Sequence, residues 1–292
     1  MKLGVWLPIV SAHPRQKTSR WELEGGPEQI RQIAQAADAL GYDSICTPEH
    51  IAVPLGRPEG TKYWDPLSTL GFIAAHTQRV RLVPLVLVLG YHHPLDIVKR
   101  YGTLDLISGG RVTVGVGSGG TEGEFEMLGA PFHDRGRRAD DSMRAIRASL
   151  GHQVASYSGE YYKFSEMVVD PTLRADARFW VGGGSRAALR RAFAYANGWA
   201  PVGLPLERVR AQLRDIDLSS HVGPDDGPFE IVVLPAGDGV LDPMGDPGAA
   251  SSFLAEAADA GVTTVLPRLV STSATHYLDQ MAELTELAGD AT

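Results

Sequence analysis

The residue best suited to proton chemistry is His50, in the Glu49-His50 step that ends the second apolar run of the chain. An imidazole titrates close to neutral pH, so it can take up or release a proton beside a reacting group. Two further histidines, His92 and His93, follow the third apolar run. Either could face a pocket, but a His-Pro step is also an ordinary start of a helix. The sequence makes His50 the candidate catalytic residue and leaves the roles of the other two open.

A glycine-rich turn before a helical segment has the composition of a phosphate cradle. It comprises Gly182, Gly183, Gly184, Ser185 and Arg186, directly after an apolar Phe-Trp-Val. Backbone N–H groups at the start of a helix attract anions, and the Ser and Arg can add a hydrogen bond and a charge. The Lys-Ser/Thr pair of a P-loop does not follow. The pattern indicates phosphate binding, although glycine turns before helices also occur as plain structure.

A second glycine-rich stretch, Gly115-Val-Gly-Ser-Gly-Gly120, also follows an apolar run. A dinucleotide fingerprint requires a helix at this point and an acidic residue at the end of the next strand, about 20 residues on. Asp140 and Asp141 fall inside a helical segment instead. We interpret the stretch as a place where a ligand can approach the backbone closely, or as a plain flexible turn.

These groups must be positioned by an alternation of strands and helices that runs along the chain. Short β-branched runs predict eight strands, several of them apolar almost throughout, as buried parallel strands are. The expected strands are Lys2–Pro8, Asp43–Thr47, Val80–Val88, Arg111–Gly117, Phe179–Gly182, Gly198–Val202, Glu230–Leu234 and Thr263–Leu266. Amphipathic segments predict helices between them, many opened by Pro and closed by Gly. Eight strands favour closure into an α/β (β/α)8 TIM barrel over an open doubly wound sheet.

The length of 292 residues suits a single barrel domain over residues 1–292, since such barrels typically have about 250 residues. Two insertion segments exceed ordinary loops: Ile51–Tyr63 after strand 2 and Ser118–Arg178 after strand 4. The second contains a helical segment near 140–150 and a strand-like stretch, Tyr157–Val169. Long insertions usually build an active site. We expect lids at Ile51–Tyr63 and Thr121–Asp134.

Charge and composition argue against several classes of protein. Lys plus Arg number 27 and Asp plus Glu 35, a net charge of −8, so we expect no nucleic-acid or anionic-membrane partner. The single cysteine, Cys46, cannot form an intramolecular disulfide, and no metal-binding motif is present. The N-terminal residues lack the features of a signal peptide, and no apolar run is long enough to span a membrane. We expect a cytoplasmic protein that acts on a small-molecule substrate.

Taken together, these residues resemble the luciferase-like monooxygenase superfamily, and within it the branch that depends on the deazaflavin coenzyme F420. The resemblance covers most of the chain. It rests on Gly4-Val-Trp-Leu-Pro, the stretch from Ala36 to His50, Tyr63-Trp-Asp-Pro-Leu, the stretch from Thr103 to Gly117, Glu124-Phe-Glu-Met-Leu-Gly, Trp180-Val-Gly-Gly-Gly-Ser and Asn197-Gly-Trp-Ala-Pro. The Ser-Gly-Gly-Arg block at Ser108 and the Gly-Gly-Gly-Ser block at Gly182, in this order, are the most specific part.

The resemblance implies a barrel with a flavin-like ring at its C-terminal mouth, and usually a homodimer formed through the early helices. It gives His50 the catalytic role. The implied cofactor contacts are Gly117, Ser118 and Gly119 for the tail and Gly182, Gly183, Gly184, Ser185 and Arg186 for the phosphate. A bulge with a non-prolyl cis peptide bond, expected near Val88, Leu89 and Gly90, would lie behind the ring. Trp64 and Trp199 could also line a ring-shaped ligand.

The function that we expect is hydride transfer between coenzyme F420 and an organic substrate or NADP, with His50 handling the proton. An FMN-dependent two-component monooxygenase of the same fold is an alternative, and so is a non-catalytic flavin-binding protein. Two departures from related sequences bear on the site. Small residues from Ser118 to Thr121 replace a bulky one and leave room over the ring. The first loop, Ile9–His13, lacks the acidic residue that some relatives pair with the histidine, so no acid–base pair is carried over.

Overall fold

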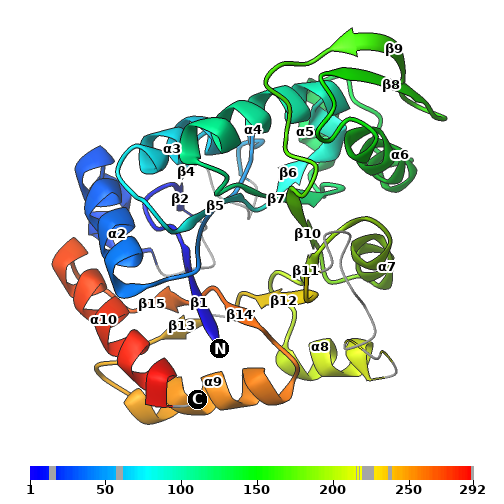
Figure 1. Ribbon diagram of the computed structural model, residues 1–292. Coiled ribbons are helices and arrows are strands. Elements are labelled where there is room, and N and C mark those ends of the chain that lie inside the picture. Colours follow the sequence, from blue (N-terminus) through cyan, green and yellow to red (C-terminus); the bar gives the residue numbers. More distant parts are fainter. Residues whose placement is uncertain are drawn as a thin grey trace.

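The computed structural model describes residues 1–12, 18–56, 62–214, 216, 218, 227–235 and 239–290. Parallel strands form a ring with helices outside it (Figure 1). In chain order the barrel strands are β1 (Lys2–Trp6), β3 (Ser44–Thr47), β5 (Arg81–Pro84) with β6 (Leu87–Val88), β7 (Thr113–Gly117), β10 (Arg178–Gly182), β11 (Gly198–Ala200), β12 (Glu230–Val233) and β14 (Thr264–Val265). They run in the order β5-β3-β1-β14-β12-β11-β10-β7-β6, and a bridge between Leu82 and Val112 joins the two ends. The eight predicted strands and the (β/α)8 barrel are confirmed.

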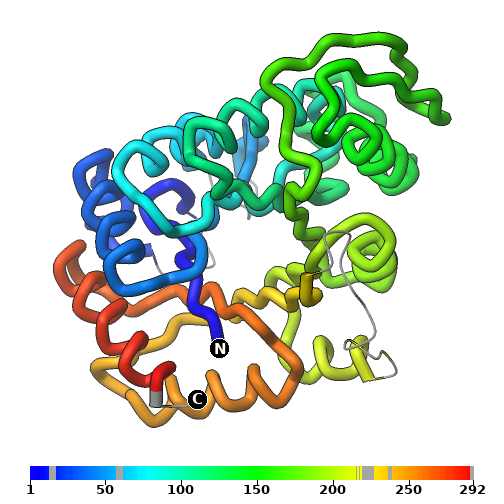
Figure 2. The backbone as a smooth tube through the Cα atoms, in the orientation of Figure 1, coloured from blue at the N-terminus to red at the C-terminus, as the bar shows by residue number. Residues whose placement is uncertain are grey.

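The helices cover the outer face of this barrel. They are α2 (Pro27–Leu40), α3 (Pro66–Ala74), α4 (Pro94–Ser108), α6 (Arg135–Arg147), α7 (Arg186–Tyr195), α8 (Leu206–Leu213), α9 (Pro247–Asp259) and α10 (Ala274–Asp290). Four of them begin with proline, and α2 and α4 end at Gly41 and Gly109 in the left-handed conformation, as the sequence predicted. The last helix, α10, packs beside α2, so the chain returns to its start (Figure 2).

The third strand is interrupted. Pairing with β3 ends at Pro84, and pairing with β7 resumes only at Leu87. The non-prolyl cis peptide joins Leu85 to Val86, inside this gap, so its expected position near Val88, Leu89 and Gly90 is wrong. Residues 80–88 form one nearly continuous apolar run in the sequence, which predicts an unbroken strand with the irregularity only after its end. Leu89–Tyr91 form a short 3-10 helix, η1, instead.

The two insertions lie next to the barrel strands that they follow. After β3, the short strand β4 (Lys62–Tyr63) pairs antiparallel with β2 (Ser11–Ala12), near the helix α1 (Arg20–Glu24), and residues 57–61 lie outside the described part. After β7 come α5 (Glu122–Met127), α6 and an antiparallel hairpin, β8 (Val154–Ser158) and β9 (Lys163–Val168), which projects from the barrel (Figure 1). The strand-like stretch is therefore most of a hairpin. Two further strands, β13 (Val240–Leu241) and β15 (Arg268–Leu269), pair beyond β12 and β14.

One buried carboxylate ties the hairpin to α6. Asp141 accepts hydrogen bonds from the Tyr157 hydroxyl at 2.6 Å and from the backbone N–H groups of Tyr161 and Tyr162 at 2.8 and 3.1 Å. These bonds outweigh the opposing effect of burial and lower the pKa of Asp141 to about 2. The insertion is thus anchored through an ionised side chain at its turn.

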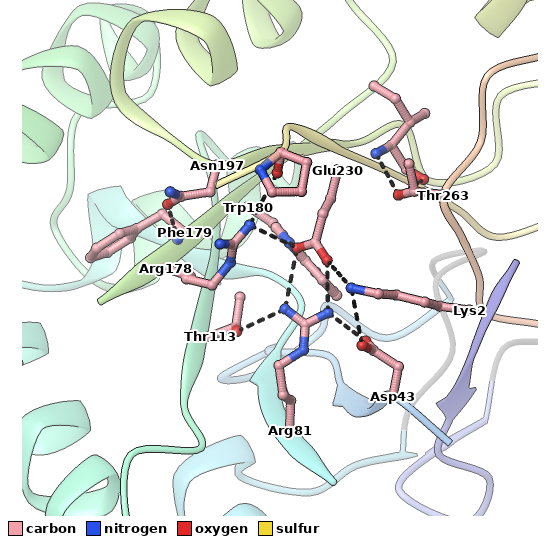
Figure 3. A network of polar contacts seen from close by, with 12 residues as sticks. Lys2, Asp43, Arg81, Thr113, Arg178, Phe179, Trp180, Asn197, Glu230 and Thr263 are labelled. Carbon is pink, nitrogen blue, oxygen red and sulfur yellow. Dashed lines mark hydrogen bonds and ion pairs between the residues drawn. The ribbon is translucent and has the colours of Figure 1, made fainter. Parts of the chain in front are cut away.

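A network of charged side chains closes the N-terminal end of the barrel (Figure 3). Glu230 is 3% exposed and accepts hydrogen bonds from Arg81 at 3.0 and 3.2 Å, from Lys2 at 2.9 Å and from the Trp180 indole at 2.8 Å. Arg81 also pairs with Asp43. Burial would raise the pKa of Glu230, but the charges and hydrogen bonds of Arg81 and Lys2 lower it to about 2. Each buried charge of this network therefore has an oppositely charged partner, which offsets the cost of its burial.

Apolar side chains fill the interior above this network. The inner cluster comprises Cys46, Val83, Leu85, Trp180, Ala200, Val232, Leu234 and Leu266. Cys46 is fully buried among them, and burial raises the pKa of its thiol, so it is a packing residue. A larger cluster lies between the strands and the helices. No helix in the described ranges combines the length and apolarity needed to cross a bilayer.

Candidate functional site

A cavity of about 530 Å³ opens at the C-terminal end of the barrel, where the insertions lie. Its lining residues follow the ends of most of the barrel strands, which is where TIM barrels carry their active sites. They are Trp6, Ser11, Pro48, Glu49, His50, Tyr63, Leu85, Val86, Val88, Tyr91, Ser118, Gly119, Gly120, Thr121, Gly182, Gly183, Val202 and Leu234. The size is in the range of small-molecule sites.

His50 is held at the cavity by a buried carboxylate. Its Nδ1 lies 2.7 Å from Oε2 of Glu124, which is fully buried at the start of α5. The other oxygen of Glu124 accepts the backbone N–H of Ile51 at 2.9 Å. An ionised carboxylate can only accept, so Nδ1 carries the hydrogen, and Nε2 is the ring nitrogen that remains for a ligand. A neutral His50 therefore presents a lone pair to the cavity, as a general base requires.

Two tyrosines line the cavity near the His50–Glu124 pair. The ring of Tyr63, on β4, lies over His50 with 4.3 Å between ring centroids. Tyr91, on η1, packs edge-on against Phe125. Burial and the negative charge of Glu124 raise the pKa of the Tyr91 phenol, which therefore stays neutral. Tyr63 thus contacts His50 directly, whereas Tyr91 lies close to its partner Glu124.

The interrupted third strand forms an apolar wall of the cavity with Leu85, Val86 and Val88. Val86 fits into space left by two glycines on neighbouring strands. A Cβ on Gly117 would come within 2.8 Å of a Val86 methyl group, and one on Gly182 would clash with the other methyl group. These glycines therefore make room for a protein side chain, which differs from the predicted close approach of a ligand.

Other glycines leave open space at the cavity. A Cβ on Gly120 would meet nothing within 4 Å, and one on Gly183 would meet only Ala188, at 3.4 Å. Gly183 has φ +113, which other residues rarely adopt. Its carbonyl accepts the Trp199 indole N–H at 2.8 Å, and that ring is fully buried outside the cavity lining. The backbone at Gly120 and Gly183 is thus where a ligand can come close.

The predicted phosphate cradle lies beside the cavity. Ser185 caps α7 by accepting the N–H of Ala188 at 3.1 Å, and Ser185 and Arg186 are exposed. Gly184 holds the start of α7 to α8 through a 2.7 Å bond from Gln212 to its carbonyl. The turn has the open backbone and the charge that bind an anion.

The structure brings half of the twelve predicted site residues to the cavity lining. Those that line it are His50, Val88, Ser118, Gly119, Gly182 and Gly183, and those that do not are Leu89, Gly90, Gly117, Gly184, Ser185 and Arg186. Leu89 is fully buried, and a Cβ on Gly90 would press against Phe125 at 2.6 Å, so both are packing residues of the wall. Trp64 lines a separate cavity between α2 and α3 and does not reach the ring site. Residue 13 and part of the first lid, residues 57–61, lie outside the described part.

Sequence reasoning missed the two carboxylates of the site and its aromatic side chains. Glu124 stood in a quoted family motif, and Glu49 stood beside His50, but neither received a role. Trp6, Tyr63 and Tyr91 were also overlooked. The sequence feature that could have identified these residues is their position at or near the end of a strand or of an insertion. No metal-binding group of three His, Cys, Asp or Glu side chains occurs in the described ranges.

Comparison with known proteins identifies the family. Residues 1–236 match the family model named luciferase-like monooxygenase. The chain belongs to this family. An uncharacterized protein of Mycobacterium tuberculosis is 31% identical over 217 residues, which cover 69% of this chain and 75% of that protein. The FMNH2-dependent dimethylsulfone monooxygenase of Pseudomonas putida is 27% identical over 226 residues, covering 74% of this chain and 60% of that protein.

Solved structures of luciferase-like fold match this chain along almost its whole length. The monooxygenase RslO1 from Streptomyces bottropensis superposes with a TM-score of 0.75 at 22% identity, covering 99% of both chains. An F420-dependent secondary alcohol dehydrogenase in complex with an F420-acetone adduct superposes with a TM-score of 0.74 at 12% identity, covering 98% of both chains. At these identities the likeness shows the shared fold. Among these proteins, the names of the alcohol dehydrogenase and of the dimethylsulfone monooxygenase give coenzyme F420 and FMNH2, respectively, and the chain is an enzyme of the luciferase-like monooxygenase family.

Proposed function

We propose that this protein binds coenzyme F420 in the cavity and transfers a hydride between carbon 5 of the deazaflavin and an organic substrate or NADP. The observation that carries the proposal is the pairing of His50 with Glu124 opposite an apolar wall, at the C-terminal mouth of the barrel. The F420-dependent dehydrogenase of the same fold supports the choice of cofactor.

The residues present fit a flavin-like ring. Leu85, Val86 and Val88 provide an apolar surface, and the open backbone at Gly120 leaves room next to it. The exposed turn at Ser185 and Arg186 is placed to bind the phosphate of the tail. When bound, the coenzyme supplies or accepts the hydride, and the protein supplies orientation and electrostatics.

In this proposal His50 moves the proton that accompanies the hydride. Glu124 holds Nδ1–H, so Nε2 accepts a proton from a substrate hydroxyl in oxidation and returns it in reduction. Glu124 is a positioning residue, because it sets the tautomer and stabilises the imidazolium without touching the substrate. The insertions after β3 and β7 exclude water from the cavity. We further propose a homodimer that acts in the cytoplasm, with molar mass in solution as the test of the dimer.

The second candidate is an FMN-dependent monooxygenase, which the similarity to the dimethylsulfone monooxygenase favours. The decisive experiment titrates the protein with oxidised F420 and, in parallel, with FMN, followed by ligand fluorescence. Micromolar binding of F420 with weak binding of FMN supports the proposal, and tight binding of FMN alone replaces it with the monooxygenase. Binding of neither refutes both.

A variant separates binding from proton transfer. His50→Ala should leave F420 affinity within about threefold and lower the rate of F420 bleaching by roughly 10²- to 10⁴-fold, the usual contribution of a general acid or base. His152→Ala, at an exposed site before β8, is the matched control. Unchanged bleaching in His50→Ala would remove that residue from the mechanism.

A further inference from the structure

A second carboxylate in the cavity wall has no part in the proton transfer described above. Glu49 lines the cavity and is 6% exposed. Its Oε2 accepts the backbone N–H of Val88 at 2.7 Å, and its Oε1 lies 2.8 Å from Nε2 of His92. One side chain after β3 thus holds both the end of the interrupted third strand and the residue after η1.

His92 extends from this wall to the protein surface. Its side chain is 11% exposed, and its Nδ1 lies 3.5 Å from Oδ2 of Asp96, a half-exposed residue in the first turn of α4. Arg100 donates a hydrogen bond to the same oxygen of Asp96, at 3.2 Å. The imidazole therefore has a carboxylate near each nitrogen, one buried and one at the surface.

The charges around His92 favour its protonated form. Burial alone would lower the pKa of His92, and Arg100 acts in the same direction, but the hydrogen bond and charge of Glu49 and the charge of Asp96 raise it above 6.5. The neighbouring His93 differs: it is exposed, caps α4 by accepting the N–H of Leu95, and its pKa is lowered, chiefly by desolvation. The two adjacent histidines have separate roles, which the sequence alone left open.

We propose that Glu49 and His92 form an ion pair that positions the Val88 wall of the ring site and keeps that wall electrically neutral. The proposal rests on the ring site of the proposed function. The neutrality of the wall matters most for a ring that gains negative charge on reduction, as FMN does at neutral pH. Without the His92 charge, Glu49 would leave an uncompensated anion beside the ring, and the reduced form would be bound less well.

The pair itself can be tested without any cofactor. In protein labelled at histidine, the NMR titration of His92 should give a pKa above 6.5, and Glu49→Gln should shift it downward. The Val88 amide signal should titrate together with His92, because both bond to Glu49. A His92 pKa at or below 6.5, or one that Glu49→Gln leaves unchanged, would overturn the proposal.

The charge of the wall is tested with FMN in both redox states at pH 7 under anaerobic conditions. In His92→Gln the ratio of reduced to oxidised affinity should fall by roughly tenfold, because the unpaired charge of Glu49 then repels the negative charge that reduction adds to the ring. Glu49→Gln, which removes the negative charge and keeps an acceptor for Val88, should not lower the ratio. The double variant should restore it. His93→Asn, which retains a capping side chain, is the matched control.

A purely structural role of the pair predicts a different pattern. If the substitutions merely disrupt the wall, the affinities for oxidised and for reduced FMN should fall equally in each single variant. The double variant should then not regain affinity, and this result would refute the charge assignment. Should wild-type protein bind neither FMN nor F420, the proposed function fails, while the NMR titration still decides whether the ion pair exists. If the protein binds F420 but not FMN, the affinities of the same variants are measured for oxidised and reduced F420 instead. An unchanged ratio of these two affinities in His92→Gln then refutes the proposal.

Discussion

Glu230 at the N-terminal end of the barrel should account for much of the acid sensitivity of folding. Its pKa is about 2 in the folded protein against 4.5 ordinarily. A depressed pKa contributes stability that is complete above 4.5 and is lost as the pH falls toward 2. The shift corresponds to about 3 kcal/mol at neutral pH, of which about two fifths is lost on going from pH 6.5 to pH 3.5.

The variant Glu230→Gln removes this charge and keeps the shape. We expect the free energy of unfolding to fall by about 3 kcal/mol at pH 6.5, since Arg81 loses its ion pair with the buried Glu230 and keeps the one with Asp43. At pH 3.5 the deficit should shrink to about 2 kcal/mol, because wild type has lost part of the same interaction.

Urea unfolding followed by tryptophan fluorescence at the two pH values measures both deficits. Glu24→Gln is the control, because Glu24 is an exposed carboxylate paired with Arg20 at the surface, and such pairs are worth about 0 to 1 kcal/mol. If the deficit of Glu230→Gln were the same at both pH values, the pKa of Glu230 would not be depressed, and the account of the network would be wrong.

Three further predictions concern the site and its supports. Glu124→Gln should leave F420 affinity unchanged but lower the bleaching rate by about 10- to 100-fold, as expected when an orienting partner is lost; loss of F420 binding instead would show that Glu124 supports the cavity as a whole. Gly182→Ala should destabilise the fold by about 1 to 3 kcal/mol in urea unfolding, because its Cβ meets Val86, whereas Gly120→Ala, in open space, should not; equal effects would contradict the packing of the third strand. Asp141→Asn should speed hydrogen exchange across residues 154–168 while barrel strands stay protected; unchanged exchange there would mean that the hairpin is held by other contacts.

The barrel could be predicted because the sequence features that specify it are local and recur along the chain. Each strand is a short apolar run between helical segments, and proline and glycine mark the helix ends. The break at Leu85–Val86 could not be predicted in the same way. Residues 80–88 are apolar except for Arg81, and the space that Val86 fills is left by Gly117 and Gly182 on two other strands.

His50 and Gly183 could be selected from residue type and position alone, and both line the cavity. The pairings within the site were not predicted, because they join distant parts of the chain. Glu124 lies 74 residues from His50 and approaches it only through the insertion after β7. The first loop has no acidic residue to pair with His50, and the carboxylate that does pair with it lies in the insertion. His92 and His93 are adjacent in sequence, and only their contacts distinguish a wall residue from a helix cap.

The charge network around Glu230 and the cavity around His50 occupy opposite ends of the same barrel. They share no side chain, and effects of distant substitutions usually add. An engineer could therefore select for heat or acid tolerance at the one end and for a broader substrate range at the other, and then combine the two sets of changes in a single gene without re-optimising either.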